Sequence, residues 1–300
     1  MSPLDRARRA AWRSANRLVT MHPRSTREEL ARAVRGRTVL VTGASFGIGE
    51  ATARQLGAAG ATVLLVARTE DRLAEVARGI TAAGGTAHVH PVDLTDGDEI
   101  DGLVKRVLDE HGHVDVLVNN AGKSIRRSVE LSYDRPQDFE RTIGINYLAP
   151  VRLTLGLLPS MRARRSGHVV TVSTQGVRGM PPAPRWGAYQ ASKAALDVWM
   201  RSMALEVRGD GIATTNVYMG LVRTRMSAPT PSLRRVPAMS PDRAGAVVCD
   251  AIVRRPKSVE PWWTPLASAT SSVLSGPIDA VLSAAFRRGE DTSSARGERD

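Results

Sequence analysis

From about residue 37 to residue 262, the hydrophobic positions of the chain follow two patterns in turn. Short runs that are almost continuously apolar predict buried parallel strands, because both faces of such a strand are covered. Longer segments carry apolar residues three or four positions apart, which is the spacing of one helix face. The expected strands are 37–42, 62–67, 86–91, 115–119, 167–173, 212–218 and 257–262. The expected helices are 47–59, 70–83, 96–111, 137–164, 188–208 and 241–254.

This alternation predicts an α/β fold, namely a single Rossmann-like, doubly wound parallel sheet of about seven strands with helices on both faces. We assign residues 37–262 to this domain, and a chain of 300 residues is long enough to bury its core. Residues 225–240 contain three prolines and occupy the position of a substrate lid. Residues 1–36 are a basic N-terminal extension, expected to be helical. Residues 263–300 are an amphipathic C-terminal segment with a polar tail, expected to be disordered from residue 287.

The positive charge of the chain is concentrated ahead of the first strand. The whole chain has a net charge of +12, and residues 1–37 contain ten Arg against Asp5, Glu28 and Glu29. Apolar residues recur in this segment at helical spacing: Leu4, Ala7, Ala11, Ala15 and Leu18. The segment is either a basic amphipathic helix on anionic lipid or a solvated helix packed on the domain or on a partner subunit. A charged arm without interleaved aromatic side chains does not predict binding to nucleic acid.

The expected location is the cytoplasm, with peripheral membrane contact if the basic helix lies on lipid. No run approaches twenty apolar residues, so no segment is expected to span a bilayer, and the region order of a secretory signal is absent. Apolar residues recur again near the other end, around Gly276–Pro277: Leu266, Val273, Leu274, Ile278, Val281, Leu282 and Phe286. This element either covers the substrate cleft, extends a dimer interface or lies at a membrane interface. We expect a homo-oligomer, either a dimer or a tetramer.

Cysteine and histidine predict little chemistry. The single cysteine, Cys249, excludes an intramolecular disulfide, which fits a reducing cytosol, and we interpret it as a small buried hydrophobe. The six histidines show no paired ligand spacing, so we expect no metal site. His111 and His113 lie near a helix end, where a helix-terminal or solvated role is expected.

A glycine-rich turn joins the first strand of the domain to its first helix. Gly43, Gly47 and Gly49 follow the apolar strand residues with the spacing GxxxGxG. Gly43 permits a tight reversal, Gly47 lets the backbone approach a pyrophosphate, and Gly49 allows close helix packing. The helix N-terminus adds unpaired N–H groups and positive potential, so the turn predicts a phosphate site. A glycine turn alone also fits an ordinary connection between a strand and a helix.

The end of the second strand bears on the choice of dinucleotide. A Rossmann fold places an acid about 20 residues beyond the glycine turn, where it binds the ribose 2′-hydroxyl. Ala67 stands at that position, and Arg68 follows it. A guanidinium suits a 2′-phosphate, so NADP(H) is expected rather than NAD(H). The alternative is that Arg68 is an ordinary surface arginine at a strand end.

Tyr189 and Lys193 lie four residues apart in an expected helix, so the phenol and the ammonium share one helix face. A fixed cation beside a phenol favours the phenolate and lowers the phenol pKa toward the range of a general acid. The pair alone also fits a solvated helix face. The pair becomes evidence for a catalytic site because the glycine turn lies upstream of it.

Together these motifs resemble the short-chain dehydrogenase/reductase family over roughly residues 36–262. The resemblance is carried by Thr42 to Gly49, Asp93-Leu94, Asn119 to Gly122, Asn146 and Tyr189-x-x-x-Lys193. It implies that the following residues bind the cofactor: Gly43, Ser45, Phe46, Gly47, Ile48, Gly49, Arg68, Asp93, Leu94, Asn120, Ala121, Gly122, Tyr189, Lys193, Val222 and Thr224.

The same resemblance implies a role for each residue near the reacting atoms. Asp93 would contact the adenine, and Thr224 the nicotinamide carboxamide. Asn146 would hold a water in a proton relay, and Tyr189 would donate or accept the proton. Lys193 would bind the nicotinamide ribose and tune Tyr189.

Two positions depart from the family pattern. Where the family motif on the fifth strand ends in two serines, the second of which holds the substrate carbonyl, this chain has Ser173 and Thr174. A threonine hydroxyl donates the same hydrogen bond, although its methyl group restricts the rotamer and crowds the substrate. We favour Thr174 for this role, with Ser173 as the alternative, because only one of two neighbours in a strand faces the cleft. Met219 stands where a proline usually precedes the glycine.

Three further stretches are similar to bacterial reductases related to the reductase domain of fatty acyl-CoA reductases: residues 119–128, 138–142 and 221–230. The expected function is therefore NADPH-dependent reduction of a small, hydrophobic carbonyl substrate, a long-chain acyl-CoA or an aldehyde. One alternative is an NADP-dependent alcohol dehydrogenase that works in the oxidative direction with the same residues. Another is a catalytically impaired scaffold that only binds the cofactor.

Overall fold

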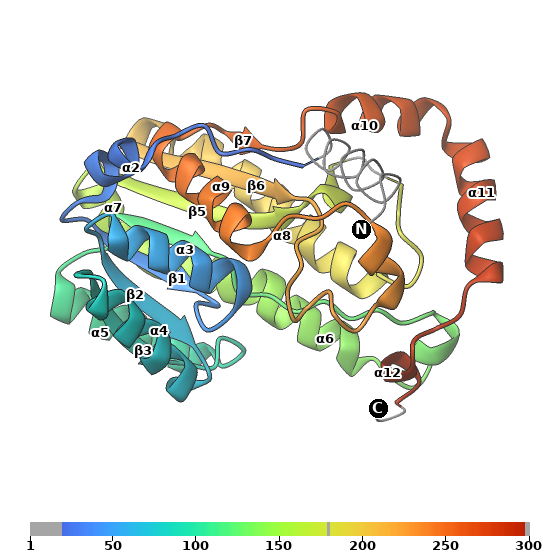
Figure 1. Cartoon of the computed structure of the whole chain (residues 1–300), viewed down its shortest axis with the longest axis horizontal. Helices are drawn as coiled ribbons and strands as arrows, with labels where there is room; N and C mark the ends of the chain where they lie inside the picture. Colours follow the sequence, from blue (N-terminus) through green and yellow to red (C-terminus); the bar gives the residue numbers. More distant parts are fainter. Residues whose placement is uncertain (1–19, 179–180, 298–300) are drawn as a thin grey trace, which may run out of the picture.

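A seven-stranded sheet lies at the centre of the computed structural model, which describes residues 20–178 and 181–297 (Figure 1). All neighbouring strands are parallel, in the order β3-β2-β1-β4-β5-β6-β7. The strands are β1 (Thr38–Thr42), β2 (Thr62–Ala67), β3 (Thr86–Pro91), β4 (Val116–Asn119), β5 (Gly167–Thr174), β6 (Ile212–Met219) and β7 (Ser258–Val259). The predicted fold class is confirmed. The order reverses between β1 and β4, and such sheets bind ligands at the carboxyl ends of the strands beside that point.

Helices cover both faces of this sheet. The first core lies under α2 (Arg27–Val34), α3 (Gly47–Ala58), α4 (Glu70–Ala82) and α9 (Pro241–Arg254). The second core lies under α5 (Gly97–His111), α7 (Ala149–Ala163) and α8 (Gly187–Glu206). In β1, Val39 and Val41 point into the first core and Leu40 into the second, and none of the three is exposed. Burial on both faces explains why the strand is continuously apolar.

The expected helix 137–164 is helical from Gln137 to Ala163, but its middle is not α-helical. It consists of α6 (Gln137–Ile143), a π-helical turn η2 (Gly144–Leu148) and α7. The hydrophobic pattern gives no sign of the change, because helical spacing continues on both sides of it. π-helical turns are rare and occur frequently at functional sites. This one contains Asn146, whose side chain is fully buried.

The last strand is shorter than the expected 257–262. Only Ser258–Val259 form β7, and they pair with Asn216 and Val217 of β6. Pro256 and Pro261 flank the pair, and proline has no N–H to donate to a strand ladder.

The N-terminal extension is described from Thr20 onward, so the expected helix with Leu4 to Leu18 lies outside the described residues. The helix α2 begins with a capping box formed by Thr26 and Glu29. Its Leu30 and Val34 are buried in the first core, where α2 contacts α9.

Three helices follow the sheet: α10 (Thr264–Val273), α11 (Ser275–Arg288) and α12 (Ser293–Arg296). Figure 1 shows α10 and α11 at the outer edge of the molecule, and α12 beside the end of α6. The break between the helices falls at Leu274, whereas Gly276 and Pro277 lie in the first turn of α11, where proline is tolerated. Apolar side chains are exposed along this segment: Leu266, Val273, Leu274 and Val281. None of the described helices is long and apolar enough to cross a membrane.

The expected disorder from residue 287 is wrong for the described residues 287–297. Ala295 is buried, and Asp291 pairs with Arg126 and Arg185. Local composition does not reveal this order, because the partners of the tail lie more than a hundred residues earlier in the sequence.

Candidate active site

The glycine turn between β1 and α3 adopts the backbone that its sequence favours. Gly43 (φ +66°) and Gly47 (φ +61°) are in the left-handed region, where glycine has no steric penalty. A Cβ atom on Gly49 would lie 2.5 Å from the side-chain nitrogen of Asn120 and closer still to the carbonyl oxygen of Gly43. The start of α3 therefore lies directly against the turn and against the loop after β4.

The start of α3 fits a phosphate group. Its N-cap residue, Phe46, makes no side-chain hydrogen bond to the helix, so the cap side chain does not occupy the amides at the positive end of the helix dipole. The Phe46 ring lies between two cations, with the guanidinium carbon of Arg225 at 4.2 Å and that of Arg72 at 4.7 Å from its centroid. Arg225 belongs to the expected lid, so this contact joins the lid to the turn.

Thr42 connects the glycine turn to the end of β4, a role that sequence reasoning did not assign. Its hydroxyl donates to the carbonyl of Val118 (3.2 Å) and accepts from the backbone N–H groups of Asn120 and Ala121 (3.0 Å each). The side chain of Asn120 donates to the carbonyls of Thr42 (2.9 Å) and Gly43 (3.3 Å). Asn120 thus holds the two walls of the cleft together through their backbones.

Arg68 and Asp93 meet at the carboxyl ends of β2 and β3. The Nη1 atom of Arg68 lies 3.8 Å from Oδ2 of Asp93, and 75% of the Arg68 side chain is exposed. Asp93 accepts hydrogen bonds from the backbone N–H (2.9 Å) and hydroxyl (2.8 Å) of Thr95. These bonds, together with the charge of Arg68, hold the pKa of Asp93 below its usual range. An exposed guanidinium at this edge is accessible to a bound anion.

Tyr189 and Thr174 are neighbours where α8 begins and β5 ends. Burial raises the pKa of Tyr189, and the nearby Thr174 side chain opposes that shift. Ser173 is 6% exposed, and its Oγ has no hydrogen-bond partner among the described residues. Of the two candidates for the carbonyl-binding hydroxyl, Thr174 is the one beside Tyr189.

Lys193 is buried one turn further along α8. Its Nζ donates to the carbonyl oxygen of Val172 at 3.0 Å, and burial lowers its pKa to about 8. The expected lowering of the Tyr189 pKa by Lys193 is not present in this structure. The reason is that the ammonium binds a backbone carbonyl of β5, while burial dominates the shift of the phenol.

Asn146 connects the loop after β4 to α8. Its Oδ1 accepts from the N–H of Lys123 (2.8 Å), and its Nδ2 donates to the carbonyl of Lys123 (2.8 Å) and to the Ser192 hydroxyl (2.9 Å). Ser192 in turn donates to the carbonyl of Tyr189 (2.8 Å). A Cβ atom on Gly122 would lie 2.9 Å from Oδ1 of Asn146, so the loop needs glycine there. Sequence reasoning missed Ser192, although its place three residues after Tyr189 puts it on a neighbouring helix position.

The expected lid begins against the glycine turn. The methyl group of Thr224 lies 3.1 Å from the position that a Cβ atom would take on Gly47. Val222 is buried and forms a bridge with Met239, which closes the base of the lid. The guanidinium of Arg223 donates to two carbonyls of the lid, each at 3.1 Å. The other expected cofactor residues lie in the glycine turn (Ser45), in the first turn of α3 (Ile48) and in the loop after β3 (Leu94).

Histidines that the sequence analysis treated as scattered come together in space. His90, Glu110 and His111 offer ligand atoms within 4.8 Å of one another. The Nε2 atoms of both histidines are buried and have no hydrogen-bond partner in the described part of the chain. Burial lowers the pKa of both rings and favours the neutral form, which is the one that ligates metals. The overlooked signal is His88-x-His90, since residues two apart in a strand share a face.

A glycine turn at a helix N-terminus, and Tyr189 one helical turn from the buried Lys193, lie at the carboxyl edge of a doubly wound parallel sheet. This combination defines an oxidoreductase of the dinucleotide-binding type. The chain belongs to the short chain dehydrogenase family, which matches residues 37–234, and it is an NAD(P)-dependent enzyme.

Two relatives are similar over most of the chain. An uncharacterized oxidoreductase of Mycobacterium tuberculosis (strain ATCC 25618 / H37Rv) is 47% identical over 268 residues, which are 88% of this chain and 78% of the relative. The fatty acyl-CoA reductase of Acinetobacter baylyi is 45% identical over 267 residues, which are 89% of this chain and 90% of the relative. Both relatives support the resemblance to a family of oxidoreductases, and the second also supports the narrower similarity to fatty acyl-CoA reductases.

Solved structures share the fold. A metagenomic short-chain oxidoreductase in complex with NADP is similar with a TM-score of 0.67 and 35% identity, over 76% of this chain and 97% of the other. L-Sorbose reductase from Gluconobacter frateurii, complexed with NADPH and L-sorbose, has a TM-score of 0.67 and 27% identity, over 76% of this chain and 94% of the other. The family therefore binds a nicotinamide cofactor on this scaffold.

Proposed function

We propose that this protein is an NADPH-dependent carbonyl reductase that acts on a hydrophobic substrate, a long-chain acyl-CoA or aldehyde. The observation that carries the proposal is the placement of Tyr189, the neighbouring Thr174 and the buried Lys193 together at the carboxyl edge of the sheet. The similarity to the fatty acyl-CoA reductase of Acinetobacter baylyi supports the substrate class. Relatives that hold NADP or NADPH support the dinucleotide.

Reduction of a carbonyl needs a hydride on carbon and a proton on oxygen. Bound NADPH supplies the hydride. The hydroxyls of Thr174 and Tyr189 hold the carbonyl oxygen, and Tyr189 donates its proton to that oxygen as negative charge develops there. An aldehyde then leaves as the alcohol, whereas an acyl thioester leaves as the aldehyde and the free thiol. Because burial raises the pKa of Tyr189, the phenol is protonated at neutral pH, as a proton donor requires.

Lys193 and Asn146 support this transfer. With a pKa of about 8, Lys193 is mostly protonated at neutral pH, and its ammonium is held against β5 by the carbonyl of Val172. By the family resemblance, Lys193 binds the nicotinamide ribose. Asn146 fixes the loop after β4 against the helix that carries Tyr189. By the family resemblance, Asn146 also positions the water that returns a proton to the phenol.

Arg68 supports the choice of NADPH. Its guanidinium is exposed at the end of β2, where the ribose of a dinucleotide lies in this fold. Ala67 precedes it and has no carboxylate to repel a 2′-phosphate. The same residues would catalyse the oxidative direction, since an enzyme does not change the equilibrium. The contact between Thr174 and Tyr189 argues against a catalytically impaired scaffold.

Consumption of NADPH by the purified protein in the presence of a long-chain aldehyde tests this function. Tyr189→Phe removes only the donated proton and should lower kcat by roughly 100-fold or more, with NADPH binding unchanged. Tyr133→Phe is the matched control, because Tyr133 is 80% exposed, and it should retain full activity. Wild-type turnover in Tyr189→Phe would contradict the proposal.

A further inference from the structure

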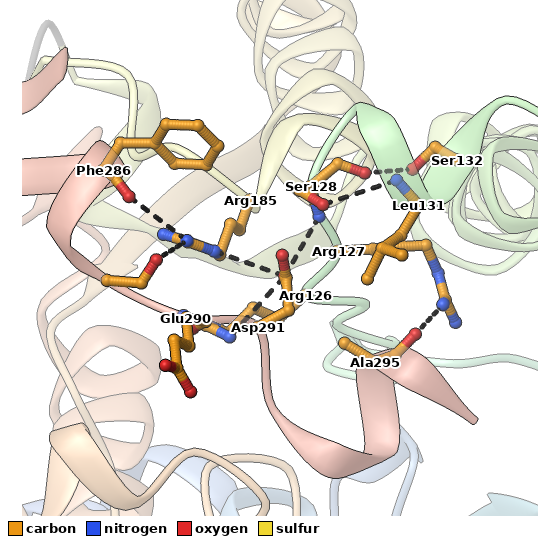
Figure 2. A network of polar contacts seen from close by, with 11 residues as sticks. Arg126, Arg127, Ser128, Leu131, Ser132, Arg185, Phe286, Glu290, Asp291 and Ala295 are labelled. Carbon is orange, nitrogen blue, oxygen red and sulfur yellow. Dashed lines mark hydrogen bonds and ion pairs between the residues drawn. The ribbon is translucent and has the colours of Figure 1, made fainter. Parts of the chain in front are cut away.

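Residues 287–297, here the C-terminal tail, return to the body of the protein and contact two loops beside the candidate active site (Figure 2). The first, here the β4 loop, covers residues 120–129, and the second, here the α8 loop, covers residues 181–186. A backbone hydrogen bond from Arg127 to Arg185 (2.7 Å) joins the two loops. The β4 loop begins at Asn120, and the α8 loop ends three residues before Tyr189, so the tail contacts both chain segments that lead to candidate site residues.

One carboxylate oxygen of the tail is at the centre of these contacts. Oδ1 of Asp291 lies 3.2 Å from Nε of Arg185 and 4.0 Å from Nη1 of Arg126, and it accepts from the backbone N–H of Ser128 at 3.2 Å. Figure 2 shows both guanidinium groups also turned toward backbone carbonyls of the tail. Arg126 donates to the backbone carbonyl of Glu290 (3.3 Å). Arg185 donates to the backbone carbonyls of Phe286 and Gly289.

This arrangement leaves two mostly buried arginines short of acceptor oxygens. The side chains of Arg126 and Arg185 are 15% and 8% exposed, and a single carboxylate serves both. Nε and Nη1 of Arg126 and Nε of Arg185 are buried without a well-formed hydrogen bond in the described part of the chain. Burial and the charge of Arg185 lower the pKa of Arg126, which marks a pair of cations in excess of their anions. Arg185 also has a φ of +74°, in the left-handed region, which costs a residue other than glycine free energy.

An open groove of about 450 Å³ begins beside Arg185. Its walls come from α11, the β4 loop with the next residue, and the α8 loop. Most of the lining is apolar: Val129, Pro182, Pro184, Leu282 and Phe286. Two acids, Glu130 and Asp279, and Ser283 also line the groove. The Arg185 guanidinium lies 4.3 Å from the centroid of the Phe286 ring. The site therefore combines a cationic end with an apolar trough, which suits a ligand that is anionic at one point and apolar beside it.

We propose that Arg126 and Arg185 bind a phosphate group of an acyl-CoA substrate and that Asp291 occupies this site until the substrate displaces it. The inference rests on the proposed function and adds the site that recognises the thioester form. A phosphate brings several acceptor oxygens, so it satisfies the N–H groups that one carboxylate leaves unpaired. The groove then accommodates the less polar part of the coenzyme A group, next to the phosphate.

Kinetics with a matched pair of substrates tests this site, namely a long-chain acyl-CoA and the aldehyde of the same chain length. Arg185→Gln should raise the KM for the acyl-CoA roughly 10-fold or more, because charge-assisted hydrogen bonds are lost. It should leave the KM for the aldehyde within about twofold, since the aldehyde has no phosphate. Asp291→Asn should lower the KM for the acyl-CoA several-fold by removing the competing carboxylate. Glu290→Gln is the control, because only the backbone carbonyl of Glu290 takes part.

Calorimetric titration with free coenzyme A separates this inference from the proposed function. Coenzyme A should bind the wild type, bind Asp291→Asn more tightly and bind Arg185→Gln weakly, whether or not the protein turns over NADPH. Equal effects of Asp291→Asn on both substrates would show that the tail only braces the loops, and the inference would be wrong. Absence of coenzyme A binding to both the wild type and Asp291→Asn would also overturn it. Failure of aldehyde reduction alone would count against the proposed function.

Discussion

Thr174 stands where the family pattern has a serine, and its surroundings suit the same role. Thr174→Ala should lower kcat with an aldehyde roughly 100-fold, because one hydrogen-bond donor to the developing oxyanion is lost. Thr174→Ser keeps the hydroxyl and should retain activity. Ser173→Ala should change kcat less than about twofold, because the Ser173 hydroxyl is buried without a partner in the described chain and loses no bond. Steady-state NADPH consumption measures all three variants.

The two alanine variants decide between the neighbouring hydroxyls. A large loss in Ser173→Ala with full activity in Thr174→Ala would assign the carbonyl to Ser173 instead. The sequence alone left this choice open, because alternation in a strand tells only that one neighbour faces the cleft. The structure adds the contact between Thr174 and Tyr189, which depends on how α8 is placed against β5.

Arg68 is the second residue whose role depends on a ligand. Arg68→Asp should weaken NADPH binding roughly 10- to 100-fold, because a cation beside the 2′-phosphate becomes an anion. NADH binding should be unchanged or stronger, since an acid at this edge suits a 2′-hydroxyl. Dissociation constants from cofactor fluorescence measure the ratio. Arg78→Asp, an exposed change of the same charge on α4, is the control, and an equal loss for both cofactors would remove Arg68 from the phosphate site.

At the scale of whole elements, the sequence predicts helices and strands best where burial alone determines the hydrophobic pattern. Six of the expected strands coincide with β1 to β6 within a residue or so at each end, because burial on both faces requires continuous apolar runs. The π-helical turn around Asn146 was missed, since the helix continues on both sides and only the backbone hydrogen-bond pattern changes. The ordered tail was missed because Asp291 pairs with Arg126 and Arg185, which are distant in sequence.

The junction of β1 and α3 gives a prediction at this scale. Gly49→Ala should destabilise the fold by about 1–3 kcal/mol, because the added methyl group overlaps the turn and the Asn120 side chain. It should also weaken dinucleotide binding by moving the turn. Chemical unfolding and cofactor titration measure the two effects.

Gly102→Ala in α5 is the matched control. A Cβ atom there would meet only the end of the Arg106 side chain, at 3.7 Å. Alanine in a helix interior is favoured over glycine, so this variant should gain about 0.5–1 kcal/mol of stability and leave cofactor binding unchanged. Unchanged stability and unchanged cofactor affinity in Gly49→Ala would mean that the turn and α3 are not in contact as described.

For the molecule as a whole, the sequence predicts well which residues are buried. It predicts less well which side chains from different elements contact one another. The pairs His90–His111 and Arg185–Asp291 come from separate elements, and their contact follows from the packing of helices and loops that the pattern does not specify. The Tyr189–Lys193 pair could be predicted, because both residues belong to one helix with a fixed repeat. Even there, the partner of the ammonium is a strand carbonyl, which only the tertiary structure reveals.

The stability of the whole molecule at low pH should depend on His168 in the centre of the sheet. This residue is fully buried in β5, and its Nε2 lies 2.9 Å from the hydroxyl oxygen of Thr215. The Thr215 hydroxyl already donates to the carbonyl of Pro256 (2.6 Å), so Nε2 of His168 carries the proton and donates to Thr215. Its Nδ1 has no partner in the described chain, and burial lowers the pKa of the ring to about 3.

The pKa of His168 is lower in the folded chain than in the unfolded chain, and this difference determines the sign of the pH effect. Above pH 6.5 the ring is neutral in both states and contributes nothing. As the pH falls below 6.5, the unfolded chain binds a proton that the folded chain excludes until about pH 3, so the free energy of unfolding decreases. Between pH 7 and pH 5 this loss is about 2 kcal/mol, and it needs only a folded-state pKa well below 5. Urea unfolding of His168→Gln over the same range should lack that loss, whereas His22→Gln, an exposed control, should keep it. Parallel pH profiles for the wild type and His168→Gln would mean that the ring takes up its proton in the folded sheet, which requires an acceptor at Nδ1.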